Sequence, residues 1–135
     1  MKVELAKSAG FCFGVKRAVD SVYQMIEDGK GHVYTLGPII HNEQVVNDFD
    51  QKGVRVVEDP DEIGDVPDAT LIIRSHGVSQ DVIDHLEQNH ISYADATCPF
   101  VKKIHNTVLE YSRKGYYIAI IGSPEHPEVQ GIEGW

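Results

Sequence analysis

Two cysteines are the residues of this sequence whose chemistry is easiest to place. Cys12 lies between Gly10 and Gly14, and Cys98 is followed by Pro99. Each stands where an extended segment is expected to pass into a helix, so backbone N–H groups and the helix N-terminus would favour a thiolate. A lone cysteine is more often a small buried hydrophobic residue. The local setting nevertheless favours a metal ligand or a nucleophile at both positions.

Three histidines and one glutamate could complete a reactive site. His41, His76 and His126 lie in loops marked by glycine or proline, and their long spacings, with neighbouring hydroxyl and amide side chains, suit a bound phosphate better than zinc. Glu128 follows His126 by two positions. On composition alone it is a solvated carboxylate, but in a water-poor cleft it could donate a proton. Histidines expected to be surface or hydrogen-bonded structural residues are His32, His85, His90 and His105.

Composition limits the classes of function. The chain has 135 residues, 21 acidic against 12 basic side chains and a net charge of −9, which argues against general affinity for nucleic acid or anionic membranes. An anionic ligand must therefore be held by a local site. No apolar run is long enough to span a bilayer and no secretory signal is visible, so we expect a cytoplasmic protein with reduced thiols.

The elements that must position these residues alternate along the chain. Asn42 is a plausible N-cap, Pro99 suits a first helical turn, and Ala18 and Val22 lie on one face of a predicted helix. Helices are expected after residues 12, 42, 79 and 98, and strands at 3–6, 32–36, 54–57, 69–73, 91–95 and 116–121. This order predicts an α/β fold, a parallel sheet with flanking helices, whose ligands bind beyond the carboxyl ends of the strands.

Five motifs, taken together, resemble the 4-hydroxy-3-methylbut-2-enyl diphosphate reductases, a family of the non-mevalonate isoprenoid route. They are Gly10-Phe-Cys12-Phe-Gly-Val15, Gly37-Pro-Ile-Ile-His41-Asn42, Arg74-Ser-His76-Gly77, Asp95-Ala-Thr-Cys98-Pro99 and His126-Pro-Glu128. The resemblance implies a three-lobed α/β protein around a [4Fe-4S] iron-sulfur cluster held by three cysteines. Residues 1–97 would form the first lobe and 98–135 the beginning of the second.

The resemblance also implies roles for single residues. Cys12 and Cys98 would be the first two cluster ligands, His41 and His76 diphosphate contacts, and His126 a substrate contact. Glu128 would relay protons to the leaving hydroxyl. The implied reaction is the reductive dehydroxylation of the allylic diphosphate to isopentenyl and dimethylallyl diphosphate, with a ferredoxin or flavodoxin as electron donor.

Two other classes of function stay open at this point. One is a module that binds a phosphorylated metabolite without redox chemistry, and the other is a mononuclear zinc site built from Cys12, Cys98 and a loop histidine. The family's third cysteine would lie beyond Trp135, so we expect the sequence to be part of a longer protein. For the isolated 135 residues we expect neither a stable cluster nor activity, because two thiolates cannot replace three.

Overall fold

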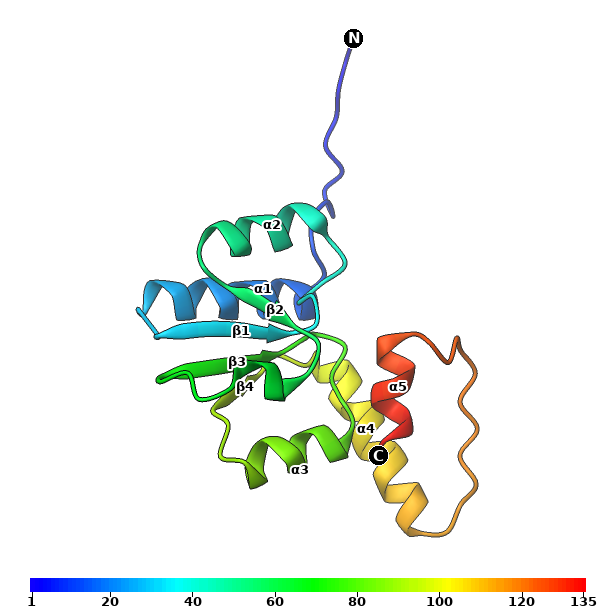
Figure 1. Cartoon of the computed structure of the whole chain (residues 1–135). Coiled ribbons are helices and arrows are strands. Elements are labelled where there is room, and N and C mark those ends of the chain that lie inside the picture. Colours follow the sequence, from blue (N-terminus) through cyan, green and yellow to red (C-terminus); the bar gives the residue numbers. More distant parts are fainter.

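A four-stranded parallel sheet is the centre of the structure, a computed structural model that describes all 135 residues (Figure 1). Its strands run in the order β2-β1-β3-β4, and every neighbouring pair is parallel. The strands are β1 (His32–Leu36), β2 (Arg55–Val57), β3 (Ala69–Ile73) and β4 (Tyr93–Asp95). The predicted α/β class with a parallel sheet is therefore confirmed.

Helices cover both faces of this sheet. In Figure 1, α1 and α2 lie on one side and α3 on the other, while α4 and α5 pack against each other beyond the ends of the strands. The helices are α1 (Phe13–Glu27), α2 (Glu43–Gln51), α3 (Gln80–Gln88), α4 (Pro99–Arg113) and α5 (Pro127–Glu133), with a short 3-10 helix, η1, at Pro60–Ile63. None of these helices combines the length and the apolar character needed to cross a lipid bilayer.

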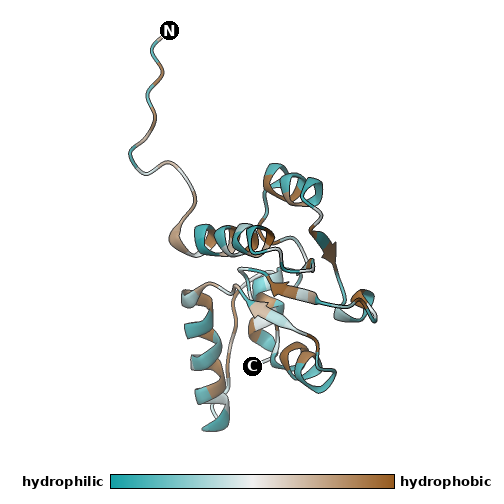
Figure 2. Ribbon diagram, turned by 90° about the vertical axis from the view of Figure 1, so that its left-hand side faces the viewer, coloured by the Kyte–Doolittle hydropathy of each residue, from teal (hydrophilic) through white to brown (hydrophobic).

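Alternating side chains of β3 supply the cores on the two faces. Ile72 packs in one hydrophobic cluster with Ala18 and Val22 of α1, and Leu71 packs in the other with Leu86 of α3. All five are completely buried. Figure 2 shows hydrophobic residues along the strands and hydrophilic residues over much of the helical surface. The strands in the middle of the sheet are thus buried on both faces, as their apolar sequences predict.

The carboxyl ends of the strands are level with one another. Leu36 pairs in register with Val57 and with Ile73, and Ile73 pairs with Asp95. The loops that follow β1, β3 and β4 therefore leave the sheet at a single edge. This register is what brings residues distant in sequence to one place.

Two predicted strands are wrong. Residues 3–6 and 116–121 form no strand, and Leu5 and Ile121 are 87% and 100% exposed. An extended segment becomes a strand only when a neighbour accepts and donates its backbone hydrogen bonds, and neither segment has such a neighbour in this chain. Cys12 and His126 consequently do not follow strands. Cys12 precedes a helix as expected, whereas the helix that begins after His126, α5, was not predicted.

Candidate functional site

Ser75 connects three of the loops at the carboxyl edge of the sheet. Its backbone N–H and its hydroxyl both donate to the carbonyl of Ile39, at 3.4 and 3.2 Å, and its own carbonyl accepts from the N–H of Cys98 at 2.9 Å. The side chain is 6% exposed. A buried residue with these partners fixes the loop of His41, the loop of His76 and the start of α4 relative to one another.

The three loop histidines lie together, as the sequence predicts. The ring centroids of His41 and His76 are 4.8 Å apart, those of His76 and His126 are 5.8 Å apart, and those of His41 and His126 are 6.4 Å apart. Asn42 is the N-cap of α2, as predicted, and its Oδ1 accepts from the N–H of Val45 at 3.1 Å. That cap fixes the chain immediately after His41. Three imidazoles at these separations can contact the oxygens of one phosphate group.

His76 is the electrostatically unusual member of this cluster. Burial, and then the positive charges of His41, Arg74 and His126, lower its pKa from 6.5 to about 4. Its Nδ1 atom is buried and has no hydrogen-bond partner. The ring is therefore neutral at pH 7 in the free protein. An anion bound among the histidines would offset these causes and favour the charged ring.

The depressed pKa of His76 gives an expected dependence of stability on pH. The unfolded chain binds the proton near pH 6.5 and the folded chain only near pH 4, so the free energy of unfolding falls as pH is lowered through this window. One group with this shift contributes at most about 3 kcal/mol, and less where water still reaches the ring. Urea unfolding of the chain between these pH values, with and without His76→Gln, measures the contribution.

The comparison with a matched variant isolates His76 from the carboxylates that also titrate in this range. His76→Gln should flatten part of the profile, whereas His32→Gln, at an exposed position of β1, should leave the profile unchanged. Equal pH slopes for the parent and His76→Gln would show that this ring is not held neutral by its surroundings.

Glu128 and His126 are joined at the beginning of α5. His126 is the N-cap, and its Nδ1 accepts a hydrogen bond from the backbone N–H of Glu128 at 3.2 Å. Because Nδ1 is the acceptor, the neutral ring carries its proton on Nε2. Glu128 is half-buried in the first turn of the helix. The imidazole N–H and the carboxylate are thus presented from the same helical turn.

Cys12 and Cys98 each occupy the N-cap of a helix, and the two helix starts meet. Both thiols are free, Cys12 is exposed, and neither side chain makes a capping hydrogen bond. A Cβ atom on Gly14 would lie 2.4 Å from Sγ of Cys98, so the first turn of α1 touches that thiol. Arg17 holds the arrangement by donating from Nη2 to the carbonyl of Thr97 at 2.8 Å.

This pair of thiols fits a partial ligand set. Two accessible sulfurs at adjoining helix N-termini are suitable ligands for an iron-sulfur cluster. The chain contains no third cysteine. It also contains no group of three or more His, Cys, Asp or Glu side chains placed to hold a metal ion. The geometry therefore does not support the alternative of a zinc site built from Cys12, Cys98 and a loop histidine.

The histidine at position 105 differs from expectation. His105 was predicted to be a surface or hydrogen-bonded residue, but it is 3% exposed and its Nε2 has no partner. On α4, Ile104 is 41% exposed, whereas the buried positions are Val101 and His105. The i,i+4 spacing of Val101 and His105 is the signal that could have identified this face.

Comparison with protein families and with known proteins gives consistent results. Residues 3–135 match the family model described as LytB protein. The chain is 53% identical to the 4-hydroxy-3-methylbut-2-enyl diphosphate reductase of Thermoanaerobacter sp. (strain X514) and 46% identical to that of Clostridioides difficile (strain 630), in both cases over 100% of this chain. It covers 47% and 48% of those proteins. The chain spans about half the length of the curated relatives it matches.

Solved structures agree with the sequence matches. A structure of (E)-4-hydroxy-3-methyl-but-2-enyl diphosphate reductase, the terminal enzyme of the non-mevalonate pathway, superposes with a TM-score of 0.81 at 43% identity, over 96% of this chain and 45% of the other. The reductase from Plasmodium falciparum gives a TM-score of 0.86 at 33% identity, over 95% of this chain and 40% of the other. The same fold and a match over nearly the whole sequence show that the chain belongs to the LytB family.

Proposed function

We propose that the protein containing this chain reduces 4-hydroxy-3-methylbut-2-enyl diphosphate to isopentenyl and dimethylallyl diphosphate. The allylic C–O bond breaks, and the hydroxyl leaves as water after taking up a proton. An external reductant supplies two electrons, and a second proton reaches the allylic carbon skeleton. The names of the relatives support this substrate and this class of reaction.

The observation that carries the proposal is the cluster of three imidazoles, whose loops at His41 and His76 are tied through Ser75 to the start of α4. There the thiol of Cys98 meets the first turn of the helix that Cys12 caps. His41 and His76 would bind the diphosphate, and an anion there would make the charged form of His76 favourable. His126 would donate from Nε2 to the substrate, because its Nδ1 is already engaged. Glu128 would hold the proton that the leaving hydroxyl takes up.

Cys12 and Cys98 would hold a [4Fe-4S] cluster together with a third cysteine outside these residues. When bound, this cluster would supply the electrons and a Lewis-acidic iron. Ferredoxin or flavodoxin would be the electron donor, and two free thiols suit the reducing cytoplasm. We also propose that residues 1–97 form a first lobe and that 98–135 begin a second.

One specific observation favours the alternative of a phosphate-binding module. The three neighbouring histidines can attract an anion without an iron-sulfur cluster. This alternative predicts that the complete protein binds the allylic diphosphate without consuming it. The reductase hypothesis predicts consumption that depends on a reductant.

The test is an anaerobic incubation of the complete protein with the allylic diphosphate and a reduced ferredoxin. We expect isopentenyl and dimethylallyl diphosphate to form, as measured by mass spectrometry, and to be absent when the reductant is omitted. Iron and sulfide are measured in the same sample. Binding of the substrate by an iron-loaded protein, with no product in the presence of reductant, would overturn the proposed function.

A further inference from the structure

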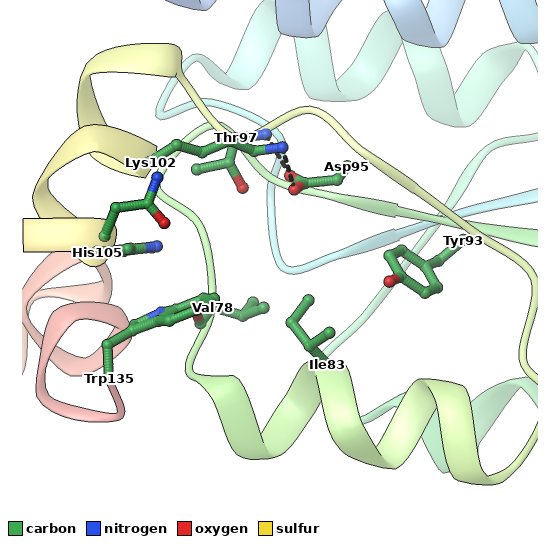
Figure 3. Close-up of a pocket in the computed structure, with 9 residues that line it drawn as sticks. Val78, Ile83, Tyr93, Asp95, Thr97, Lys102, His105 and Trp135 are labelled. Atoms are coloured by element: carbon green, nitrogen blue, oxygen red, sulfur yellow. Dashed lines mark hydrogen bonds and ion pairs between the residues drawn. The ribbon is translucent and has the colours of Figure 1, made fainter. Parts of the chain in front are cut away.

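A stacked pair of rings connects α4 with the end of α5, outside the histidine cluster. The ring centroids of His105 and Trp135 are 5.0 Å apart and their planes differ by 20°. His105 is 3% exposed, and burial lowers its pKa, so the imidazole stacks on the indole as a neutral ring. Figure 3 shows the two side chains lying against each other at one end of a pocket.

This pair presses on the backbone that immediately follows His76. A Cβ atom on Gly77 would lie 2.6 Å from Cε1 of His105, so the imidazole edge occupies the space beside that glycine. Gly77 has φ +74°, a conformation that glycine adopts without strain. From the other ring of the pair, Nε1 of Trp135 donates to the carbonyl of Val78 at 3.0 Å. Both rings thus fix the residues after His76.

The same contacts connect His76 to the helix that begins at His126. The carbonyl group of Gly77 lies 3.6 Å from the position a Cβ would take on Gly131 of α5, and the carbonyl of Gly134 accepts from the N–H of Gln80 at 3.3 Å. The loop after β3 therefore packs against the C-terminal end of α5, with the stacked rings at the side of this contact.

We propose that the His105–Trp135 stack is a positioning device that sets the separation of His76 and His126, and so the fit of the anion-binding cluster. The proposal rests on the proposed role of these histidines in binding diphosphate. It makes Trp135 and His105 positioning residues, because neither ring belongs to the cluster of imidazoles that would contact the anion.

The pocket next to the stack explains why removing the indole of Trp135 should displace His76. It has a volume of about 220 Å³ and is lined by both rings and by Val78 (Figure 3). Without the indole, the segment from Gly77 to Val78 would have free space on this side and would lose a hydrogen bond. His76 would then move away from His126 and become more accessible to water.

The experiment uses the full-length protein with Trp135→Leu and Trp135→Phe. We expect Trp135→Leu to raise the pKa of the His76 ring, followed by NMR, from about 4 toward its ordinary value of about 6.5. The KM for the allylic diphosphate should rise at least about tenfold, which corresponds to losing one hydrogen bond between His76 and the charged diphosphate. The change in kcat should be smaller. Trp135→Phe keeps the stack and should show smaller effects on both quantities.

The control is Tyr116→Leu. It removes an exposed ring that follows α4 and packs edge-on against Tyr111 of α4, the helix that carries His105. It should change neither quantity. An unchanged pKa of His76 in folded Trp135→Leu and Trp135→Phe would overturn the proposal. A raised pKa with an unchanged KM would support the positioning role and contradict the role of the histidines in binding substrate.

Discussion

Replacing Cys98 by serine in the full-length protein is expected to abolish turnover while leaving the fold intact. The serine hydroxyl stays protonated at neutral pH and is a poor ligand for iron, so bound iron and sulfide should fall. Activity should drop by more than about 100-fold, because changing only the residues around a metal's ligands already costs up to that factor. Folding should not suffer, because Cys98 occupies an N-cap and serine is a preferred residue there. Iron analysis and anaerobic assays measure both effects.

A second substitution tests whether iron binding depends on the position of the Cys98 thiol as well as on its presence. Gly14→Ala keeps both cysteines but adds a Cβ 2.4 Å from Sγ of Cys98, so the thiol must move. Bound iron should therefore fall in this variant. Alanine favours a helix more than glycine does, so lost helix stability would not explain lost iron. Gly131→Ala is the matched control, since the added carbon meets nothing closer than 3.6 Å. A full complement of iron and sulfide in Cys98→Ser would contradict the proposed ligand role.

Pyrophosphate binding by the same variants tests whether the histidine cluster holds an anion independently of the thiols. The histidines lie on other segments than Cys12 and Cys98, and neither cysteine side chain makes a capping hydrogen bond. Cys98→Ser should therefore retain affinity for inorganic pyrophosphate. Loss of both iron and pyrophosphate affinity would show that the two halves of the site depend on each other.

The middle of the fold could be predicted from sequence because its signals are local. The apolar run at β3 and the capping residue Asn42 each specify their element through side chains within a few positions. The segments 3–6 and 116–121 have similar strand-like sequences but no strand. Pairing is a property of the neighbour, which a segment's own sequence does not contain.

The candidate site likewise has features that the sequence predicts and features that depend on packing between distant segments. The proximity of His41 and His76 could be predicted because their loops follow two strands that end in register at one edge of a parallel sheet. His126 also lies in the cluster, but it reaches it from the start of α5 and not from the end of a strand. The stack of His105 on Trp135 could not be predicted in this way. It depends on how α4 and α5 pack, which no spacing within either helix determines.

Glu128→Gln is expected to lower kcat by about 10² to 10⁴, the range for removal of a positioned general acid. Glutamine has nearly the same shape as glutamate, so the hydrogen bond from the backbone N–H of residue 128 to Nδ1 of His126 and the start of α5 should persist. The amide cannot supply a proton to the leaving hydroxyl. Because the diphosphate contacts and the thiols are untouched, KM and the iron content should change little. Steady-state kinetics with saturating reductant, and iron analysis of the same sample, measure these quantities.

The neighbouring Glu125 provides a control that tests charge alone. It is exposed and lies just before His126, outside α5, so Glu125→Gln removes one negative charge from the same region without removing the proposed donor. If lower charge near the histidines were the cause, both variants would shift KM and leave kcat nearly equal. A fall in kcat confined to Glu128→Gln supports proton transfer by this carboxyl, and undiminished turnover in that variant assigns the proton to another group.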